Sequence, residues 1–253
     1  GGRIADVEGV PGNPNIVYVA TGSGGIFKTT NGGMSWTPIF DRQNTMSVGD
    51  IALEPGNPDV VWVGTGEGNP RNSVSFGDGV YKSTDGGKTW KQWNATDKAS
   101  DWIHGDNHAL WFDELDPGRI IIGNDGGVSL TYNGGERWKN FFDKIPTTQF
   151  YTVAYDMETP FNVFGAVQDE GTMSGSSFYT FGVHQDKTIR HWMMAPGGEG
   201  TQIQVDPKDH NIVFSSTYYG RLMKSDMSKP DSLWSTRIKM FDVGRIDSLR
   251  GEW

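Results

Sequence analysis

The sequence predicts an all-β fold, a β-propeller of four-stranded antiparallel blades, and three observations lead to this prediction. An eight-residue turn pattern occurs three times, at 29–36, 83–90 and 131–138. Short runs of β-branched and aromatic residues, separated by Gly- and Pro-containing turns, recur about every 50 residues. Apolar residues at helical spacing are absent throughout. Repeats of this length that each hold four short strands are typical of propeller blades.

The three copies, which we call the repeated turns, are predicted to reverse the chain between the two outer strands of a blade. In the copy at 83–90, Asp85 is expected to accept hydrogen bonds from backbone N–H groups one or two residues ahead, and the two following glycines tolerate positive φ. The Ser83 and Thr89 hydroxyls are expected to add bonds across the turn. A large ring can be buried beneath it. We predict burial for all three tryptophans of the pattern: Trp36, Trp90 and Trp138.

Composition restricts the function classes. The chain has 253 residues, a net charge of −9 and no cysteine. Nucleic acid and anionic membrane both require a basic surface, and no Lys/Arg cluster is present, so neither is expected as a partner. No apolar run is long enough for membrane insertion. Disulfides and thiolate metal sites are excluded, and no cofactor is predicted.

The strand and turn pattern predicts one propeller region over 1–253. It contains five recognisable blades, and the last two lack a complete repeated turn. Their approximate limits are 1–41, 42–97, 98–145, 146–196 and 197–245.

The repeated turn is the Asp-box, and the chain resembles the Asp-box (BNR-type) β-propellers of the sortilin-like and glycosyl-hydrolase-like secreted bacterial family. The resemblance covers nearly the whole chain and rests on five segments: Gly1–Arg3, Val10–Pro14, His108–Trp111, Asn124–Gly127 and Gln168–Asp169. It implies a seven-bladed or tandem propeller, with further blades or domains of the same protein as partners. It also implies an extracellular, cell-surface or periplasmic location.

Relatives of this kind place further blades between regions that are almost adjacent here, at 88–93 and 104–111. We therefore expect an incomplete propeller that does not close its own ring, with the gap inside 93–102, where the blade pattern is least regular.

Strand parity predicts where a site lies. In a four-stranded meander the repeated turns fall on one face, and the loops after the second and fourth strands fall on the opposite, channel face. The polar and aromatic residues of those loops are the predicted ligand-binding set: Glu67, Arg71, Asp78, His104, Asp106, His108, Asp125, Gln168, Asp169, Glu199, Tyr218 and Tyr219.

Each of these features has a structural alternative. The loop at 64–79 forms either a wall of a ligand cleft or a polar cover over a neighbouring blade. His104, Asp106 and His108 lack a third ligand at a recognised spacing, so we predict a hydrogen-bonded loop and no metal site. Asp125 stands beside glycine, as a tight turn requires. The rings of Trp102, Trp192, Tyr218 and Tyr219 could either stack on sugars or pack internally.

We therefore expect a secreted binding module for a peptide, protein or glycan at the channel face. The first alternative is an exo-acting glycoside hydrolase that uses paired carboxylates, with Asp125, Asp169 and Glu199 as candidates. The second is a structural or assembly component of a cell-surface complex. Xyloglucanase-type relatives carry a catalytic Asp after the second strand of the first blade, where this chain has the acid-free Gly22–Gly25. No sialidase-like arginine motif can be matched either, so binding is favoured and the enzyme question stays open.

Overall fold

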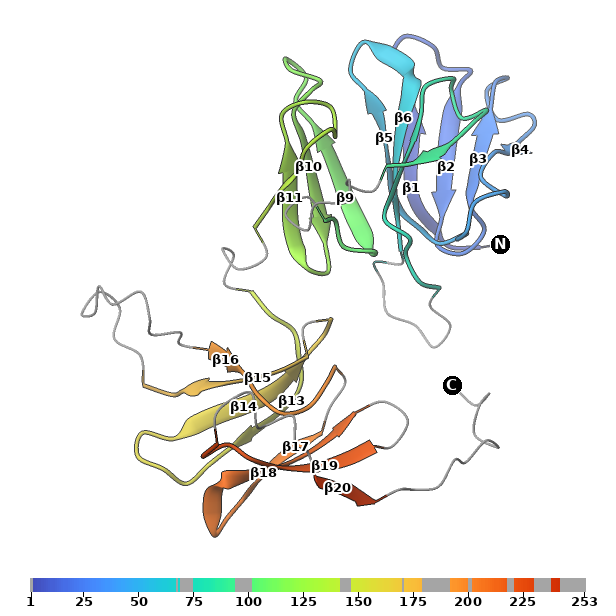
Figure 1. Cartoon of the computed structure of the whole chain (residues 1–253). Helices are drawn as coiled ribbons and strands as arrows, with labels where there is room; N and C mark the ends of the chain where they lie inside the picture. The colour runs from blue at the N-terminus through green and yellow to red at the C-terminus, as the bar shows by residue number, and fades with distance from the viewer. Residues whose placement is uncertain are drawn as a thin grey trace. The chain divides into compact units, whose positions relative to one another are not determined.

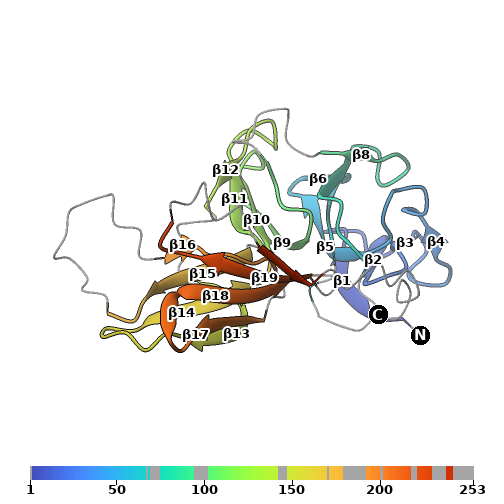
Figure 2. The same cartoon turned by 60° about the horizontal axis from the view of Figure 1, so that its bottom comes forward.

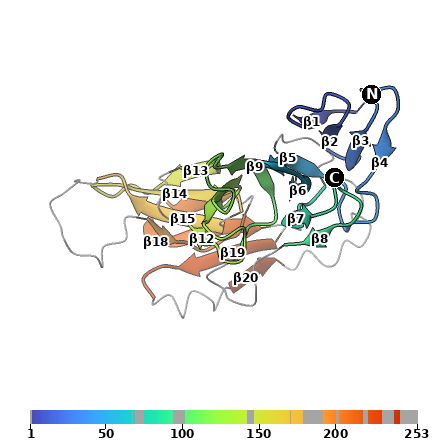
Figure 3. The same cartoon turned by 90° about the horizontal axis from the view of Figure 1, so that it is seen from above.

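The computed structural model is all-β. It describes residues 2–66, 68, 75–93, 102–141, 147–169, 171–178, 192–199, 202–217, 221–229 and 238–241. Across these residues the chain forms five four-stranded antiparallel sheets and no helix. Figure 1, Figure 2 and Figure 3 show the sheets from three directions. In every sheet the strands pair in chain order, which is the predicted meander of a propeller blade. The fold class is confirmed.

The blades are numbered in chain order. Blade one contains β1 (Ile4–Gly9), β2 (Val17–Thr21), β3 (Ile26–Thr29) and β4 (Thr37–Pro38). Blade two contains β5 (Val48–Glu54), β6 (Asn57–Thr65), β7 (Val80–Ser83) and β8 (Lys91–Gln92). Blade three contains β9 (Asn107–Phe112), β10 (Ile120–Asn124), β11 (Gly127–Thr131) and β12 (Lys139–Asn140). Blade four contains β13 (Phe150–Tyr155), β14 (Asn162–Val167), β15 (Gly171–Ser176) and β16 (Trp192–Met194). Blade five contains β17 (Ile203–Asp206), β18 (Asp209–Thr217), β19 (Arg221–Asp226) and β20 (Ile238–Phe241).

The chain divides into two compact units, Gly1–Pro146 with blades one to three and Thr147–Trp253 with blades four and five. Each is described by itself. The number of blades in a complete ring and the limits of each blade stay predictions. The predicted gap at 93–102 falls mostly outside the described residues. Among the described residues there is no helix of the length and apolar character that crossing a membrane requires.

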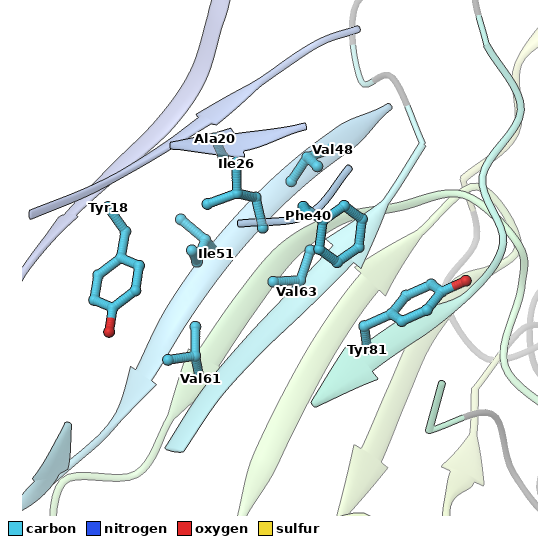
Figure 4. Close-up of a cluster of buried hydrophobic side chains, with 9 residues drawn as sticks. All are labelled: Tyr18, Ala20, Ile26, Phe40, Val48, Ile51, Val61, Val63 and Tyr81. Carbon is cyan, nitrogen blue, oxygen red and sulfur yellow. The ribbon is translucent and has the colours of Figure 1, made fainter. Parts of the chain in front are cut away.

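In unit 1, each blade packs through its first strand on the blade before it. β5 contacts β1 and β2, and β9 contacts β5 and β6. The layer between blades one and two is apolar, and Figure 4 shows its side chains gathering from both sheets. Its members are Tyr18, Ala20, Ile26, Phe40, Val48, Ile51, Val61, Val63 and Tyr81.

The layer between blades two and three is built around one tryptophan. Trp62 is fully buried and meets the rings of Trp93, Phe112 and Trp138 edge-on, at centroid distances of 6.0, 6.3 and 6.4 Å. The blades approach closely, because a Cβ on Gly49 would lie 2.3 Å from the Asn107 carbonyl oxygen. Only glycine permits this packing distance.

The repeated turns are held by the side chains that the sequence indicated. Asp85 Oδ1 accepts the N–H groups of Lys88 and Thr89, both at 2.9 Å, and its Oδ2 accepts the Thr89 hydroxyl at 2.6 Å. Ser83 Oγ accepts the Gly87 N–H at 2.9 Å and donates to Asp85 at 2.8 Å. The bonds reach three and four residues ahead, not one or two as expected, because the two glycines at positive φ carry the chain back over the carboxylate. These bonds lower the pKa of Asp85 to about 2.

Burial of the three tryptophans follows their position in the unit. Trp138 is 4% exposed and Trp90 is half-buried, whereas Trp36 is 42% exposed, so the prediction was wrong for Trp36. The reason is that each ring packs on the preceding blade. Trp90 lies edge-on to Phe40, with centroids 5.2 Å apart, and donates its Nε1–H to the Ile39 carbonyl at 2.8 Å. Blade one has no preceding blade among the described residues.

Unit 2 follows the same rule with a smaller core. β17 packs on β13 and β14. The buried cluster contains Ala154 and Phe164 of blade four together with Ile203 and Val213 of blade five. Phe164 thus fills the blade interface as Trp62 does in unit 1.

Candidate functional site

One residue links three loops at the end of unit 1 opposite the repeated turns. Asp106 Oδ1 accepts the Gly77 N–H at 2.7 Å, and the Asp106 carbonyl accepts the Asp125 N–H at 3.3 Å. The loop after β6, the loop before β9 and the turn after β10 are therefore joined. A Cβ on Gly66 or on Gly77 would lie 2.4 or 2.6 Å from the Asp106 carboxylate, so the glycines allow its insertion.

A histidine–carboxylate pair lies beside this junction. His108 Nε2 and Asp125 Oδ1 are 2.7 Å apart, the distance of a charge-assisted hydrogen bond. Both side chains are partly exposed. The pair connects β9 of blade three to the turn that follows β10. Asp125 thus has a specific side-chain partner, which its place beside glycine did not predict.

His104 orders the chain that leads into β9. Its Nδ1 accepts the Asp106 N–H at 3.1 Å, and its ring meets the exposed Trp102 ring edge-on at 5.6 Å. The Trp102 carbonyl accepts the side-chain amide of Asn140. The predicted hydrogen-bonded loop is therefore present, and it carries an exposed aromatic ring.

Asp78 lies in the same group of loops and is directed toward blade two. Its Oδ2 accepts the Tyr81 hydroxyl at 2.7 Å and the Asn44 side-chain amide at 3.0 Å. Burial, and then the bond to Asp78, raise the pKa of Tyr81. The nearby Phe76 ring is exposed, and its carbonyl accepts the Thr45 hydroxyl at 2.8 Å. Asp78 therefore serves as a loop anchor.

The predicted residues of unit 2 lie at one end of blade four. Asp169 adopts φ 61°, a left-handed conformation that Asp tolerates better than most residues, in the turn between β14 and β15. Glu199 follows β16, and that segment is joined to β15 by the bond from Thr172 Oγ1 to the Gly198 carbonyl at 3.1 Å. Gln168 donates its N–H to the Gln149 carbonyl at 3.0 Å. The two units are described separately, so this group is not placed relative to the group in unit 1.

Four predicted residues lie outside the described residues: Glu67, Arg71, Tyr218 and Tyr219. Within the described ranges, no group of three or more His, Cys, Asp or Glu side chains is arranged to hold a metal ion.

The structure also pairs two carboxylates that sequence reasoning missed. Asp6 Oδ2 and Asp50 Oδ1 accept the same N–H, that of Ile51, at 3.2 and 2.8 Å, so these two oxygens are at most about 6 Å apart. The second oxygen of Asp50 accepts the Leu110 N–H of blade three. Burial, and then a hydrogen bond with Asp6, raise the pKa of Asp50 to about 7. The sequence did contain an indication of this pair, because Asp6 and Asp50 stand at the same place in the first strands of successive blades.

Comparison with known proteins finds structural neighbours of low sequence identity and assigns no family. No protein-family model matches the chain, and no curated protein matches it. Among solved structures, an ancestral GH74 enzyme is 20% identical with a TM-score of 0.48, over 88% of this chain and 30% of the enzyme. YCF48 from Cyanidioschyzon merolae is 16% identical with a TM-score of 0.41, over 91% of this chain and 70% of YCF48. YCF48 bound to D1 peptide is 15% identical, also with a TM-score of 0.41, over 89% of this chain and 66% of the other. The chain thus spans less than a third of the GH74 enzyme's length.

Proposed function

We propose that this chain is a binding module that holds a peptide or a glycan on the channel face of a propeller. The binding surface comprises the joined loops of blades two and three, with Asp78, His104, Asp106, His108 and Asp125. The observation that carries the proposal is the bond from Gly77 to Asp106, which ties the loop after β6 to the loop before β9. A surface fixed by its own hydrogen bonds loses little conformational entropy when a ligand binds.

The acidic side chains of this surface favour binding over catalysis. Asp106 accepts a backbone N–H, Asp78 accepts a phenol and an amide, and Asp125 pairs with an imidazole. A glycosidase requires one carboxylic acid and one carboxylate directed at a sugar. Here the carboxylates bind other groups of the protein and hold the loops in place.

The chemistry of the surface indicates the ligand class. The chain has a net charge of −9, and several acids lie on this surface, so cationic or polyhydroxylated ligands are favoured over anionic ones. The exposed rings of Trp102 and Phe76 add apolar faces that suit sugar rings or peptide side chains. We also propose a place among the secreted Asp-box propellers, extracellular, on the cell surface or periplasmic. The side-chain bonds of the repeated turns support that assignment.

The test is an array of Lys- and Arg-containing decapeptides and of β-glucan oligosaccharides, probed with the purified chain. Hits are then titrated by calorimetry. We expect a Kd below about 100 µM for at least one probe, and an increase of about tenfold or more in Asp125→Asn and His108→Gln. The matched control is Glu114→Gln, which removes one exposed acid in the β9–β10 turn, at the other end of the blade. An absence of binding to both arrays, or an equal loss in the control, would contradict the proposal.

One observation supports the hydrolase as a second candidate. Asp6 and Asp50 form a hydrogen-bonded pair of carboxyl groups, and the raised pKa of Asp50 suits a general acid. Incubation with the same oligosaccharides tests it. The hydrolase is favoured if the chain releases reducing sugar, if Asp50→Asn releases none and if Asp125→Asn remains active. It is rejected if no oligosaccharide releases reducing sugar.

A further inference from the structure

A chain of hydrogen bonds crosses the first strands of the three blades of unit 1. These strands, β1, β5 and β9, pack on one another in that order (Figure 1). Asp6 of β1 and Asp50 of β5 both accept the Ile51 N–H, at 3.2 and 2.8 Å, and the other oxygen of Asp50 accepts the Leu110 N–H of β9. Two carboxyl groups therefore connect three strands that are distant in the sequence.

The two carboxyl groups require a proton between them. An ionised carboxylate only accepts hydrogen bonds, so two ionised groups at this place repel each other and share one N–H donor. When one group is protonated, its O–H donates to the other. Burial, and then the hydrogen bond with Asp6, raise the pKa of Asp50 to about 7. The pair thus gains or loses its proton near neutral pH.

No basic side chain on the neighbouring strands replaces that proton. The strands that pack on β5 are β1, β2, β6 and β9, and neither they nor β5 itself contain lysine or arginine. The other titratable side chains of these strands are Glu8, Tyr18, Glu54, Asp59 and His108. Glu8 adds a negative charge near Asp6, and Glu54 lies near Lys82. Tyr18 and Asp59 lie beside Gly86 of the repeated turn. His108 pairs with Asp125. A proton is therefore what neutralises the pair.

Close packing joins the pair to the channel-face surface. Gly49, next to Asp50, approaches β9 so closely that a Cβ there would lie 2.3 Å from the Asn107 carbonyl oxygen. The buried Asn107 side chain donates to two carbonyls of the loop before β9, at 2.8 and 3.1 Å. Its neighbours in the chain, Asp106 and His108, belong to the proposed binding surface. A movement of β5 relative to β9 is thus transmitted to that surface.

We propose that one proton shared by Asp6 and Asp50 holds the first strands of blades one to three together, and that its loss loosens the channel-face surface. The inference rests on the proposed function only where it treats that surface as a ligand site. Loss of the proton removes the O–H···O bond and leaves two like charges facing each other, so β1 and β5 separate locally. A surface that is no longer preformed binds its ligand more weakly, so affinity falls as the pH rises.

The experiment is amide hydrogen exchange of the full chain, followed by NMR between pH 5 and pH 8 and corrected for the intrinsic effect of pH on exchange. The protection of the Ile51, Leu110 and Gly77 amides is expected to fall about tenfold across this range. Gly77 reports on the surface, because its N–H donates to Asp106. The amides of β10 and β11 are the internal reference and are expected to keep their protection.

The decisive variant is Asp6→Asn, because its amide donates to Asp50 as the protonated carboxyl group does. The three amides are expected to stay protected at pH 8 in this variant, with no dependence on pH. The matched control is Glu8→Gln, which removes the neighbouring acid of β1 and leaves the pair intact. The control is expected to keep the loss of protection at high pH.

Three results contradict the inference: protection of the three amides that does not change with pH, a fall that persists in Asp6→Asn, and an equal fall in β10 and β11, which would show that the whole unit opens. A second measurement uses any β-glucan oligosaccharide that binds, since its charge does not change with pH. Its Kd is expected to rise about tenfold from pH 5 to pH 8 in the unchanged chain and to stay constant in Asp6→Asn; a Kd without this rise also contradicts the inference. The exchange experiment needs no ligand, so an absence of binding to the arrays rejects the proposed function alone.

Discussion

The Asp6–Asp50 pair makes the stability of unit 1 depend on pH in a direction opposite to that of most surface carboxylates. Asp50 has a pKa of about 7 in the folded chain against an ordinary value of 3.8. The folded state therefore binds more protons than the unfolded state between these values. Stability from this group is fully present below about pH 4 and is lost as the pH rises to about 7.

The size of the effect follows from the shift. Three pKa units correspond to about 4 kcal/mol. Asp50 is only partly buried, so solvent screening reduces this to about 2 kcal/mol. Burial and the nearby Asp6 also raise the pKa of Glu8, which adds a slope of the same sign.

The perturbation is Asp50→Asn, measured by urea unfolding followed by tryptophan fluorescence at pH 4, 5, 6, 7 and 8. The unchanged chain is expected to lose about 2 kcal/mol across this range. The variant keeps one acceptor for two N–H donors, so it starts about 1 kcal/mol lower at pH 4 and shows only the smaller slope from Glu8. Asp41→Asn, at an exposed position, serves as the control and keeps the original slope. An Asp50→Asn variant with the slope of the unchanged chain would refute the reasoning.

Two further predictions concern single contacts in unit 1. Asp85→Ala removes the acceptor that closes its repeated turn and is expected to lower the free energy of unfolding in urea by about 1–2 kcal/mol. Asp85→Asn is expected to lower it little, because Asn133 accepts the equivalent N–H in blade three. Equal losses of stability in both variants would contradict the turn's geometry. Gly49→Ala places a Cβ against the Asn107 carbonyl and is expected to lower the free energy of unfolding by more than about 2 kcal/mol. Gly9→Ala is the control and is expected to be tolerated, because a Cβ at Gly9 would have no atom within 4 Å. An unchanged melting temperature in Gly49→Ala would show that the blades can separate there.

The sequence determined those features that depend on near neighbours. The repeated turns form because Asp85 reaches the Thr89 N–H and hydroxyl within a single reversal of the chain. The strands follow from the alternation of apolar and polar residues between Gly- and Pro-containing turns. The channel-face loops of blade three followed from strand parity, although the bond between His108 and Asp125 did not.

Only the tertiary structure decided which copies of a repeat are buried and which acids meet. Trp36 and Trp138 occupy the same place in the pattern, yet one is exposed and the other is enclosed, because burial depends on whether a blade stands before it. Asp6 and Asp50 lie in different blades and share one N–H only because β5 packs on β1. The physical reason is range: a turn is fixed by bonds within a few residues, whereas an interface between blades is fixed by surfaces that are distant in the chain and that packing brings together.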